Sequence, residues 1–201
     1  MAGRELKVVR DIVVIGAPVG GAGALTSVVS SLPPDLPATV LVVLHARPDK
    51  PILLADALSA PGRLRVTEAI DGEPLAPRRI YVAADGKHLR IRNGLIRLED
   101  NAGESACCPS VDELFRSAAE EHRERVVGVA LVHVDDEGSI GLASVRRNGG
   151  RTITHRNEQM QDPPRDSQNG DLLSHHHLEL AQVGPRIVAY VHGKNGVEEH
   201  R

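Results

Sequence analysis

Aromatic side chains are almost absent from this chain of 201 residues, which has two tyrosines, one phenylalanine and no tryptophan. The core must therefore be built from Val, Leu, Ile and Ala. The chain has almost no aromatic rings on which nucleotides or single-stranded nucleic acid could stack. The formal net charge of −3 gives no electrostatic reason to expect nucleic acid or an anionic membrane as a partner either.

Cysteine is scarce, and long apolar runs are missing. The two cysteines, Cys107 and Cys108, are adjacent and poorly placed to join distant segments, so we expect a reducing, cytoplasmic compartment. No stretch approaches the roughly 18 apolar residues of a membrane span, so we expect no membrane insertion. The apolar run after the charged N-terminus is broken by Gly16 and Pro18, which is unlike the core of a signal peptide.

What the chain does contain is typical of one globular domain. Apolar residues make up 41% and charged residues 25% of it. The length is sufficient for one sizeable core and too short for two ordinary domains. We therefore expect an N-terminal tail over 1–10, one domain over 11–192 and a C-terminal tail over 193–201.

Buried strand patterns alternate with helical segments along the chain. The continuous apolar runs 11–16 and 38–44 are typical of parallel strands that are covered on both faces. A glycine-rich turn and a helix over 22–32 separate them, which makes a βαβ unit. The remaining expected elements are strands over 64–69, 126–133 and 151–155, helices over 51–60, 111–121 and 138–147, and a closing helix near 175–182 with a strand over 186–191.

An antiparallel meander is expected inside this parallel pattern. Strands over 79–83, 88–92 and 95–99 are separated by the turn pairs Asp85-Gly86 and Asn93-Gly94, and Asn-Gly is a strong hairpin signal. The fold class is therefore α/β, a doubly wound and mostly parallel sheet with an inserted antiparallel meander. Sites in such sheets form beyond the carboxyl ends of the strands.

Six segments carry a resemblance to a known family. The run Val13-Val-Ile-Gly-Ala-Pro-Val-Gly-Gly21 resembles the Ile-Gly-Ala-Ser-Thr-Gly-Gly turn of the protein-glutamate methylesterases, the CheB-type catalytic domains. Val42-Val-Leu-His45 followed by Pro48 resembles that family's Val-Gln-His-Met-Pro segment. The other matching segments, in order, are Asp71 to Leu75, Ile80 to Leu89, Pro109 to Ala119 and Gly149 to Ile153.

The resemblance covers nearly the whole chain and implies both a fold and an activity. Family members hydrolyse glutamate methyl esters on chemoreceptors with a Ser-His-Asp site, so the implied partner is a chemoreceptor-like or other signalling protein. It places the histidine at His45 and the oxyanion turn at Val19, Gly20 and Gly21. No cofactor and no metal are implied. An N-terminal receiver domain is usual in the family and not found in this sequence, so we expect any phosphorylation control to come from a partner.

This sequence departs from the family pattern at the residues that carry the chemistry. Pro18 stands at the nucleophilic serine and has neither a hydroxyl nor a backbone N–H. Val19 removes the neighbouring threonine hydroxyl. The orienting aspartate falls on Glu137, within the loop that begins at His133, where an extra methylene would displace the contact by about an ångström and cost ~100-fold in rate. The alternative for Glu137 is a solvated acidic loop.

Other candidate chemistry is weaker. Cys108 with His45 would make a thiol–imidazole pair if the two met in space, but we favour a small structural thiol. The run His175-His-His177 on a helix would spread its side chains about 100° apart, so all three cannot face one ion, although two with an outside carboxylate stay an alternative. A dinucleotide site is excluded because Pro18 occupies the second glycine of Gly-x-Gly-x-x-Gly. For His88 and Asp112 we expect hydrogen bonds in caps or turns.

Three functions follow as hypotheses. We favour a catalytically inactive methylesterase-like domain, a pseudoenzyme or scaffold of chemotaxis-type signalling. The first alternative is an active ester or amide hydrolase with a non-standard nucleophile or a water activated by His45. The second is a sensor domain whose pocket binds a small ligand.

Overall fold

Seven parallel strands form one sheet in the order β3-β4-β2-β1-β7-β8-β9, and β5 and β6 form a separate antiparallel hairpin. The computed structural model describes residues 8–45, 54–59, 63–84, 86–100, 108–131, 138–156, 165 and 172–194. The strands are β1 (Ile12–Ala17), β2 (Thr39–Leu44), β3 (Arg65–Glu68), β4 (Arg79–Val82), β5 (Lys87–Arg92), β6 (Leu95–Asp100), β7 (Val126–Ala130), β8 (Arg151–His155) and β9 (His176–Leu178). The helices are α1 (Ala22–Ser31), α2 (Leu54–Leu58), α3 (Val111–His122), α4 (Ser139–Arg147) and α5 (Leu180–Val191), with 3-10 turns η1 (Val19–Gly21) and η2 (Arg123–Arg125).

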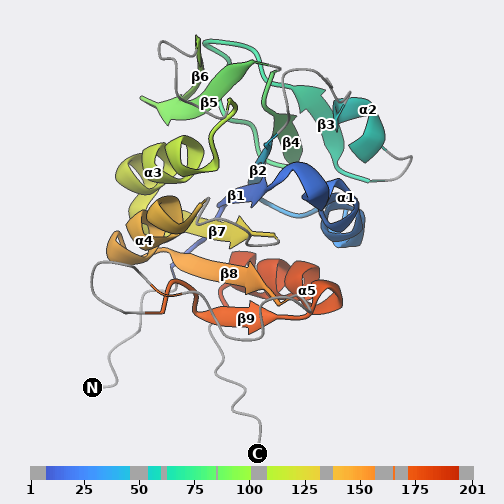
Figure 1. The fold of residues 1–201 in the computed structure, drawn as a ribbon, viewed down its shortest axis with the longest axis vertical. Coiled ribbons are helices and arrows are strands. Elements are labelled where there is room, and N and C mark those ends of the chain that lie inside the picture. The colour runs from blue at the N-terminus through green and yellow to red at the C-terminus, as the bar shows by residue number, and fades with distance from the viewer. Residues whose placement is uncertain are drawn as a thin grey trace, which may run out of the picture.

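Helices cover both faces of the sheet, with α1 and α5 on one side and α3, α4 and the hairpin on the other (Figure 1). Successive side chains of β1 alternate between the two cores: Val13 and Ile15 belong to the first, and Ile12 and Val14 to the second. Every residue of β1 and β2 is buried, because both faces are covered. The predicted doubly wound, mostly parallel α/β fold is therefore confirmed.

The predicted meander is partly wrong. β4 lies in the main sheet, parallel to both β2 and β3, and only β5 and β6 pair antiparallel. Ile80, Tyr81 and Val82 are all buried, as a strand between two neighbours requires. The turn signal after β4 marks the exit from the sheet rather than a hairpin. The predicted Asn93-Gly94 turn does join β5 to β6, and Asn93 has the positive φ of 54° that such turns need.

The C-terminal prediction is wrong, because helix and strand are exchanged. His176 and His177 of the histidine run lie in the strand β9, and the segment expected as a strand over 186–191 belongs to α5. Val183, Ile187 and Tyr190 are buried at helical spacing, so this apolar run is one face of a helix. Gly184 allows α5 to lie close to α1, since a Cβ there would collide with Ser31.

The other predicted elements agree with the structure to within a few residues where it describes them. The strand predicted over 126–133 ends as β7 at Ala130, and residues 132–137 lie outside the described part. Ser110 caps the N-terminus of α3, since its side chain accepts a hydrogen bond from the Glu113 N–H at 3.4 Å. In the described part of the chain, no helix has the length and apolar character needed to cross a bilayer.

Candidate active site

The strands that carry the candidate residues are neighbours, and their carboxyl ends meet at one edge of the sheet (Figure 1). The His45 backbone N–H donates to the Ala17 carbonyl at 2.8 Å, which sets His45 directly beside Pro18. On the other side of β1, the Leu131 N–H donates to the Gly16 carbonyl at 2.9 Å. The predicted convergence of the turn after Gly16 with His45 is therefore found in the structure. The segment that contains Glu137 follows Leu131 and lies outside the described residues.

Pro18 fits the turn without strain. Its φ of −75° and ψ of 173° are those of extended backbone, within the range that the proline ring imposes. Its carbonyl accepts a hydrogen bond from the Gly21 N–H at 2.7 Å, which closes the turn. A Cβ on Gly21 would lie only 2.9 Å from the Cβ of Ala17, so glycine is needed there, whereas Gly20 faces open space. The turn therefore has an unstrained backbone with a proline at position 18.

The start of α1, at this edge, is the positive end of a helix dipole. No side chain caps η1 or α1, and neither has an acidic residue in its first turn. Exposed N–H groups at a helix N-terminus suit an anion or a developing oxyanion. Val19 and Gly20 still offer backbone N–H groups there, whereas Pro18 has none. The side chain of Val19 lies outside the described part.

The first residue of α3, Val111, packs against the backbone at the candidate site. A Cβ on Gly16 would collide with the Val111 side chain, and one on Gly138 would come within 3.1 Å of the same residue. Gly138 has a φ of 84°, which favours glycine, and it begins α4. Val111 therefore fills the space between the end of β1 and the start of α4, and glycine at both positions makes this close approach feasible.

Asp112 holds the start of α4. Its Oδ1 accepts a hydrogen bond from the Gly141 N–H at 2.7 Å. Burial raises the pKa of this carboxyl, while hydrogen bonds from the Gly141 and Gly138 backbone act in the opposite direction. Asp112 thus caps α4 across the helix pair, and the expected cap role is confirmed.

His88 anchors the start of α3. The Ser110 N–H donates to its Nδ1 at 3.3 Å, so this nitrogen carries no proton in that arrangement. His88 is 9% exposed and lies on β5, which packs against α3. The expected turn hydrogen bond is therefore confirmed. Cys108 is half-buried and lies just before α3, and its role as a substitute nucleophile stays a prediction.

The histidine run lies elsewhere, on the outer strand of the sheet. The Nδ1 of His175 lies 2.8 Å from the Thr152 hydroxyl and accepts the Thr152 N–H at 3.1 Å, and the Nδ1 of His177 lies 2.9 Å from the Thr154 hydroxyl. Burial, then the charge of Arg151, lowers the pKa of His175 to about 4. Within the described ranges, no three His, Cys, Asp or Glu side chains are grouped to hold a metal ion.

These pairs were missed because the run was assigned to a helix. On β9, successive side chains instead alternate, and they meet the alternating threonines of β8. The spacing Thr-x-Thr on a buried strand was the signal that could have found them.

The fold and these strand ends define a doubly wound α/β domain with a candidate site at the carboxyl edge of its sheet. The family model described as CheB methylesterase matches residues 13–187. The chain therefore belongs to the CheB methylesterase family, as its sequence motifs predict.

Two relatives illustrate the similarity. The protein-glutamate methylesterase/protein-glutamine glutaminase 2 of Anaeromyxobacter dehalogenans is 40% identical over 143 residues, 71% of this chain and 42% of that protein. The protein-glutamate methylesterase/protein-glutamine glutaminase 5 of Myxococcus xanthus is 39% identical over 149 residues, 72% of this chain and 43% of that protein. The chain thus spans less than half the length of these relatives.

A solved structure agrees with the fold. The Thermotoga maritima CheB methylesterase catalytic domain superposes with a TM-score of 0.77 at 26% identity. The match covers 92% of this chain and all of that domain.

Proposed function

We propose that this domain is a catalytically inactive member of the CheB family that serves as a scaffold in chemotaxis-type signalling. One observation carries the proposal: the residue beside His45 at the end of β1 is Pro18. The family chemistry needs a hydroxyl at this position for attack on an ester and an imidazole to take its proton. Pro18 supplies no hydroxyl, so His45 has no nucleophile to activate there.

The supporting packing is retained around the altered residue. Gly16, Gly21 and Gly138 permit the close approaches of the turn and of α3, and Asp112 still caps α4. The backbone that would present a nucleophile is therefore built, although the side chain is missing. A scaffold needs only the framework, whereas a catalyst also needs the nucleophile.

The proposed partner is a chemoreceptor-like or other signalling protein. The relatives named above are protein-glutamate methylesterases and protein-glutamine glutaminases. A domain that keeps their fold without their nucleophile would bind a related protein surface and release no product.

The decisive experiment measures methanol release from a methylated chemoreceptor. We expect no release above background for the natural chain and for His45→Ala alike. Release by the natural chain that disappears in His45→Ala would overturn the proposal. It would favour a hydrolase that uses a water activated by His45 or another nucleophile such as Cys108, which Cys108→Ala would distinguish.

A restoration experiment asks whether only the chemistry was lost. The triple variant Pro18→Ser, Val19→Thr and Glu137→Asp recreates the family pattern on the retained backbone. We expect it to release methanol, and the same triple variant with His45→Ala to release none. Equal release with and without His45 would show that the recovered activity does not come from this site.

A further inference from the structure

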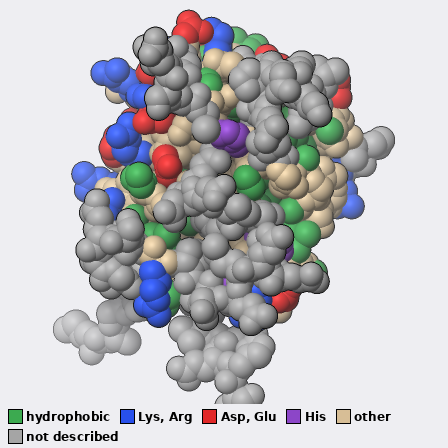
Figure 2. All heavy atoms as spheres, in the orientation of Figure 1, with side chains coloured by type: hydrophobic (Ala, Val, Ile, Leu, Met, Phe, Trp, Pro, Cys, Tyr) green, Lys and Arg blue, Asp and Glu red, His purple; other side chains and the backbone are tan. Residues whose placement is uncertain are grey.

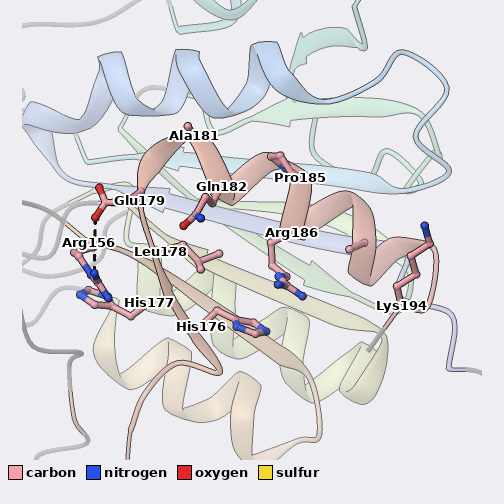
Figure 3. A pocket seen from close by; sticks show the side chains of 11 residues that line it. Arg156, His176, His177, Leu178, Glu179, Ala181, Gln182, Pro185, Arg186 and Lys194 are labelled. Atoms are coloured by element: carbon pink, nitrogen blue, oxygen red, sulfur yellow. Dashed lines mark ion pairs between the residues drawn. The ribbon is translucent and has the colours of Figure 1, made fainter. Parts of the chain in front are cut away.

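The main sheet ends in an edge strand on each side, β3 at one end and β9 at the other (Figure 1). β9 has three residues and lies beside α5, and residues of both line a groove (Figure 3). β3 has four residues, and β4 and β2 separate it from β1 and the candidate active site. A longer edge offers more backbone groups to an added strand, so β3 is the edge better suited to pairing.

The outer side of β3 presents backbone hydrogen-bonding groups. The Ala69 N–H donates to the Val82 carbonyl at 2.8 Å, so the backbone of Ala69, and that of Thr67 two residues earlier, faces β4. The intervening Val66 and Glu68 therefore direct their N–H and C=O groups away from β4. Among the described residues, no backbone group bonds to them on that side, where β3 has no neighbouring strand. These groups form a template for a further strand.

The charges along β3 indicate which strand would pair with it. Two cations, Arg63 and Arg65, stand at its start, and two carboxylates, Glu68 and Asp71, stand at its end or just beyond. All four residues are exposed. When two copies of this segment run antiparallel, the cationic start of each lies beside the acidic end of the other, which is favourable. Parallel pairing in register would instead bring like charges together.

The β5–β6 hairpin shows the same arrangement within one chain. Lys87, at the start of β5, is directly opposite Asp100, at the end of β6, and their side chains lie 2.9 Å apart. Arg90 is opposite Arg97, and it lies 3.4 Å from the diagonal carboxylate of Glu99. Basic and acidic side chains accordingly lie side by side over the hairpin (Figure 2). Both directly opposite and diagonal charge pairs therefore form where antiparallel strands of this protein meet.

One antiparallel register uses the outward backbone groups of β3 in full. With Thr67 on a two-fold axis, Val66 of each copy is opposite Glu68 of the other. Because these are the residues whose N–H and C=O groups face outward, the two pairs form four hydrogen bonds. Thr67 of one copy then faces Thr67 of the other, a favourable cross-strand pair.

The same register brings the remaining edge residues together. Asp71 of one copy falls opposite Arg63 of the other, and Arg65 is its diagonal neighbour. Ile70, which is 66% exposed, falls opposite Leu64. An exposed hydrophobic side chain thus gains an apolar neighbour.

We propose that β3 pairs antiparallel with β3 of a second copy of this chain, so that the two sheets join across a two-fold axis at Thr67. The contact is short, so the dimer is weak and depends on concentration. It carries two strand-end sites, and a partner with two matching segments would be held by both. The proposal goes beyond the proposed function, because it concerns a different surface and does not depend on whether the strand-end site hydrolyses esters.

The test measures the average mass of the full chain by sedimentation equilibrium in reducing buffer, over about a hundredfold range of concentration. We expect the mass to rise from that of one chain toward that of two. Glu68→Pro removes an outward N–H from each copy and leaves the ladder to β4 intact, so it should raise the dissociation constant at least about tenfold. Glu68→Ala is the matched control, since it keeps the N–H, and should raise the constant less than about threefold. Thermal unfolding of each variant verifies that it folds.

A cross-linking experiment tests the register. Thr67→Cys, in a chain that also carries Cys107→Ser and Cys108→Ser, places two Cα atoms about 4.5 Å apart across the axis, within the reach of a disulfide. Arg65→Cys in the same background is the control, because four residues, roughly 13 Å along the strand, separate it from its counterpart. We expect mild oxidation to give a covalent dimer with Thr67→Cys and little or none with Arg65→Cys.

Three results would overturn the proposal. An average mass of one chain at every concentration would exclude the dimer. A dimer that is as stable in Glu68→Pro as in the natural chain would place the interface elsewhere. Equal cross-linking of Thr67→Cys and Arg65→Cys would exclude the register on which the proposal rests.

Discussion

The turn after β1 and the outer edge at β9 are held together by different forces. At the turn, backbone and side chains approach closely: Gly16 lies against Val111, and Gly21 against Ala17. At the outer edge, Thr152 and Thr154 of β8 make hydrogen bonds to the imidazoles of His175 and His177. The first region depends on the size of its side chains and the second on their protonation. The turn therefore accommodates a proline at position 18 without backbone strain.

The largest expected effect tests the packing at the turn. Gly16→Ala places a Cβ against Val111, which should lower the free energy of unfolding by about 3 kcal/mol. Gly20→Ala is the matched control, because a Cβ there meets open space, and it should change stability by less than about 0.5 kcal/mol. Urea denaturation measures both. Similar losses at the two glycines would contradict the packing argument.

Removal of the α4 cap should have the next largest effect. Asp112→Ala leaves the Gly141 N–H without its acceptor, and we expect a loss of about 1–2 kcal/mol in urea denaturation. Asp112→Asn keeps an oxygen there and should lose less.

The pH dependence of Asp112 sharpens this test. Because burial raises the folded pKa of the carboxyl, its contribution is largest at low pH and declines as pH rises through the folded pKa. The stability of the natural chain relative to Asp112→Asn should therefore fall as the pH rises above the ordinary carboxyl pKa of 3.8. If the difference in unfolding free energy between the natural chain and Asp112→Asn did not change with pH, ionisation of Asp112 would not be its cause.

The outer edge should respond to acid. The folded pKa of His175, about 4, lies below the ordinary 6.5, so the contribution of neutral His175 is complete above pH 6.5 and is lost as pH falls toward 4. Protonation of Nδ1 also removes the acceptor of the Thr152 N–H. Because His175 is partly exposed, we expect the free energy of unfolding to fall by only on the order of 1 kcal/mol. His175→Gln should flatten the pH dependence of the unfolding free energy, whereas His192→Gln, at an exposed site, should leave it unchanged. Equal pH dependence in the two variants would contradict the assignment to His175.

The smallest effect is expected at Pro18 itself. Pro18→Ser restores a hydroxyl in a backbone geometry that serine also adopts, so folded contacts should hardly change. The more flexible unfolded chain should lower the free energy of unfolding by about 0.4–1 kcal/mol. Thermal unfolding measures this. A loss above about 2 kcal/mol would show that the turn has adapted to proline and is no longer the framework of a nucleophile.

Sequence patterns sufficed where local signals and packing agree. The continuous apolar runs over 11–16 and 38–44 predicted β1 and β2. The motifs also predicted that His45 and Pro18 meet at neighbouring strand ends. The motifs predicted no partner for Asp112 beyond a general cap. Its hydrogen-bond donor, the Gly141 N–H, lies 29 residues away on another helix.

Sequence reasoning failed where distant partners decide between two local structures. The run from Ile187 to Val191 is as apolar as a strand, and only its packing on α1 makes it a face of α5. The histidines before it form a strand because β8 offers threonines at the matching alternation.

The sequence by itself therefore determined the family, the parallel core and the absence of a hydroxyl at Pro18, because each depends on residue identity within a short segment. The tertiary structure alone decided the placement of β4 and the exchange of helix and strand after residue 175. These features depend on which segments meet across the sheet, and contacts between distant residues leave only weak traces in local sequence.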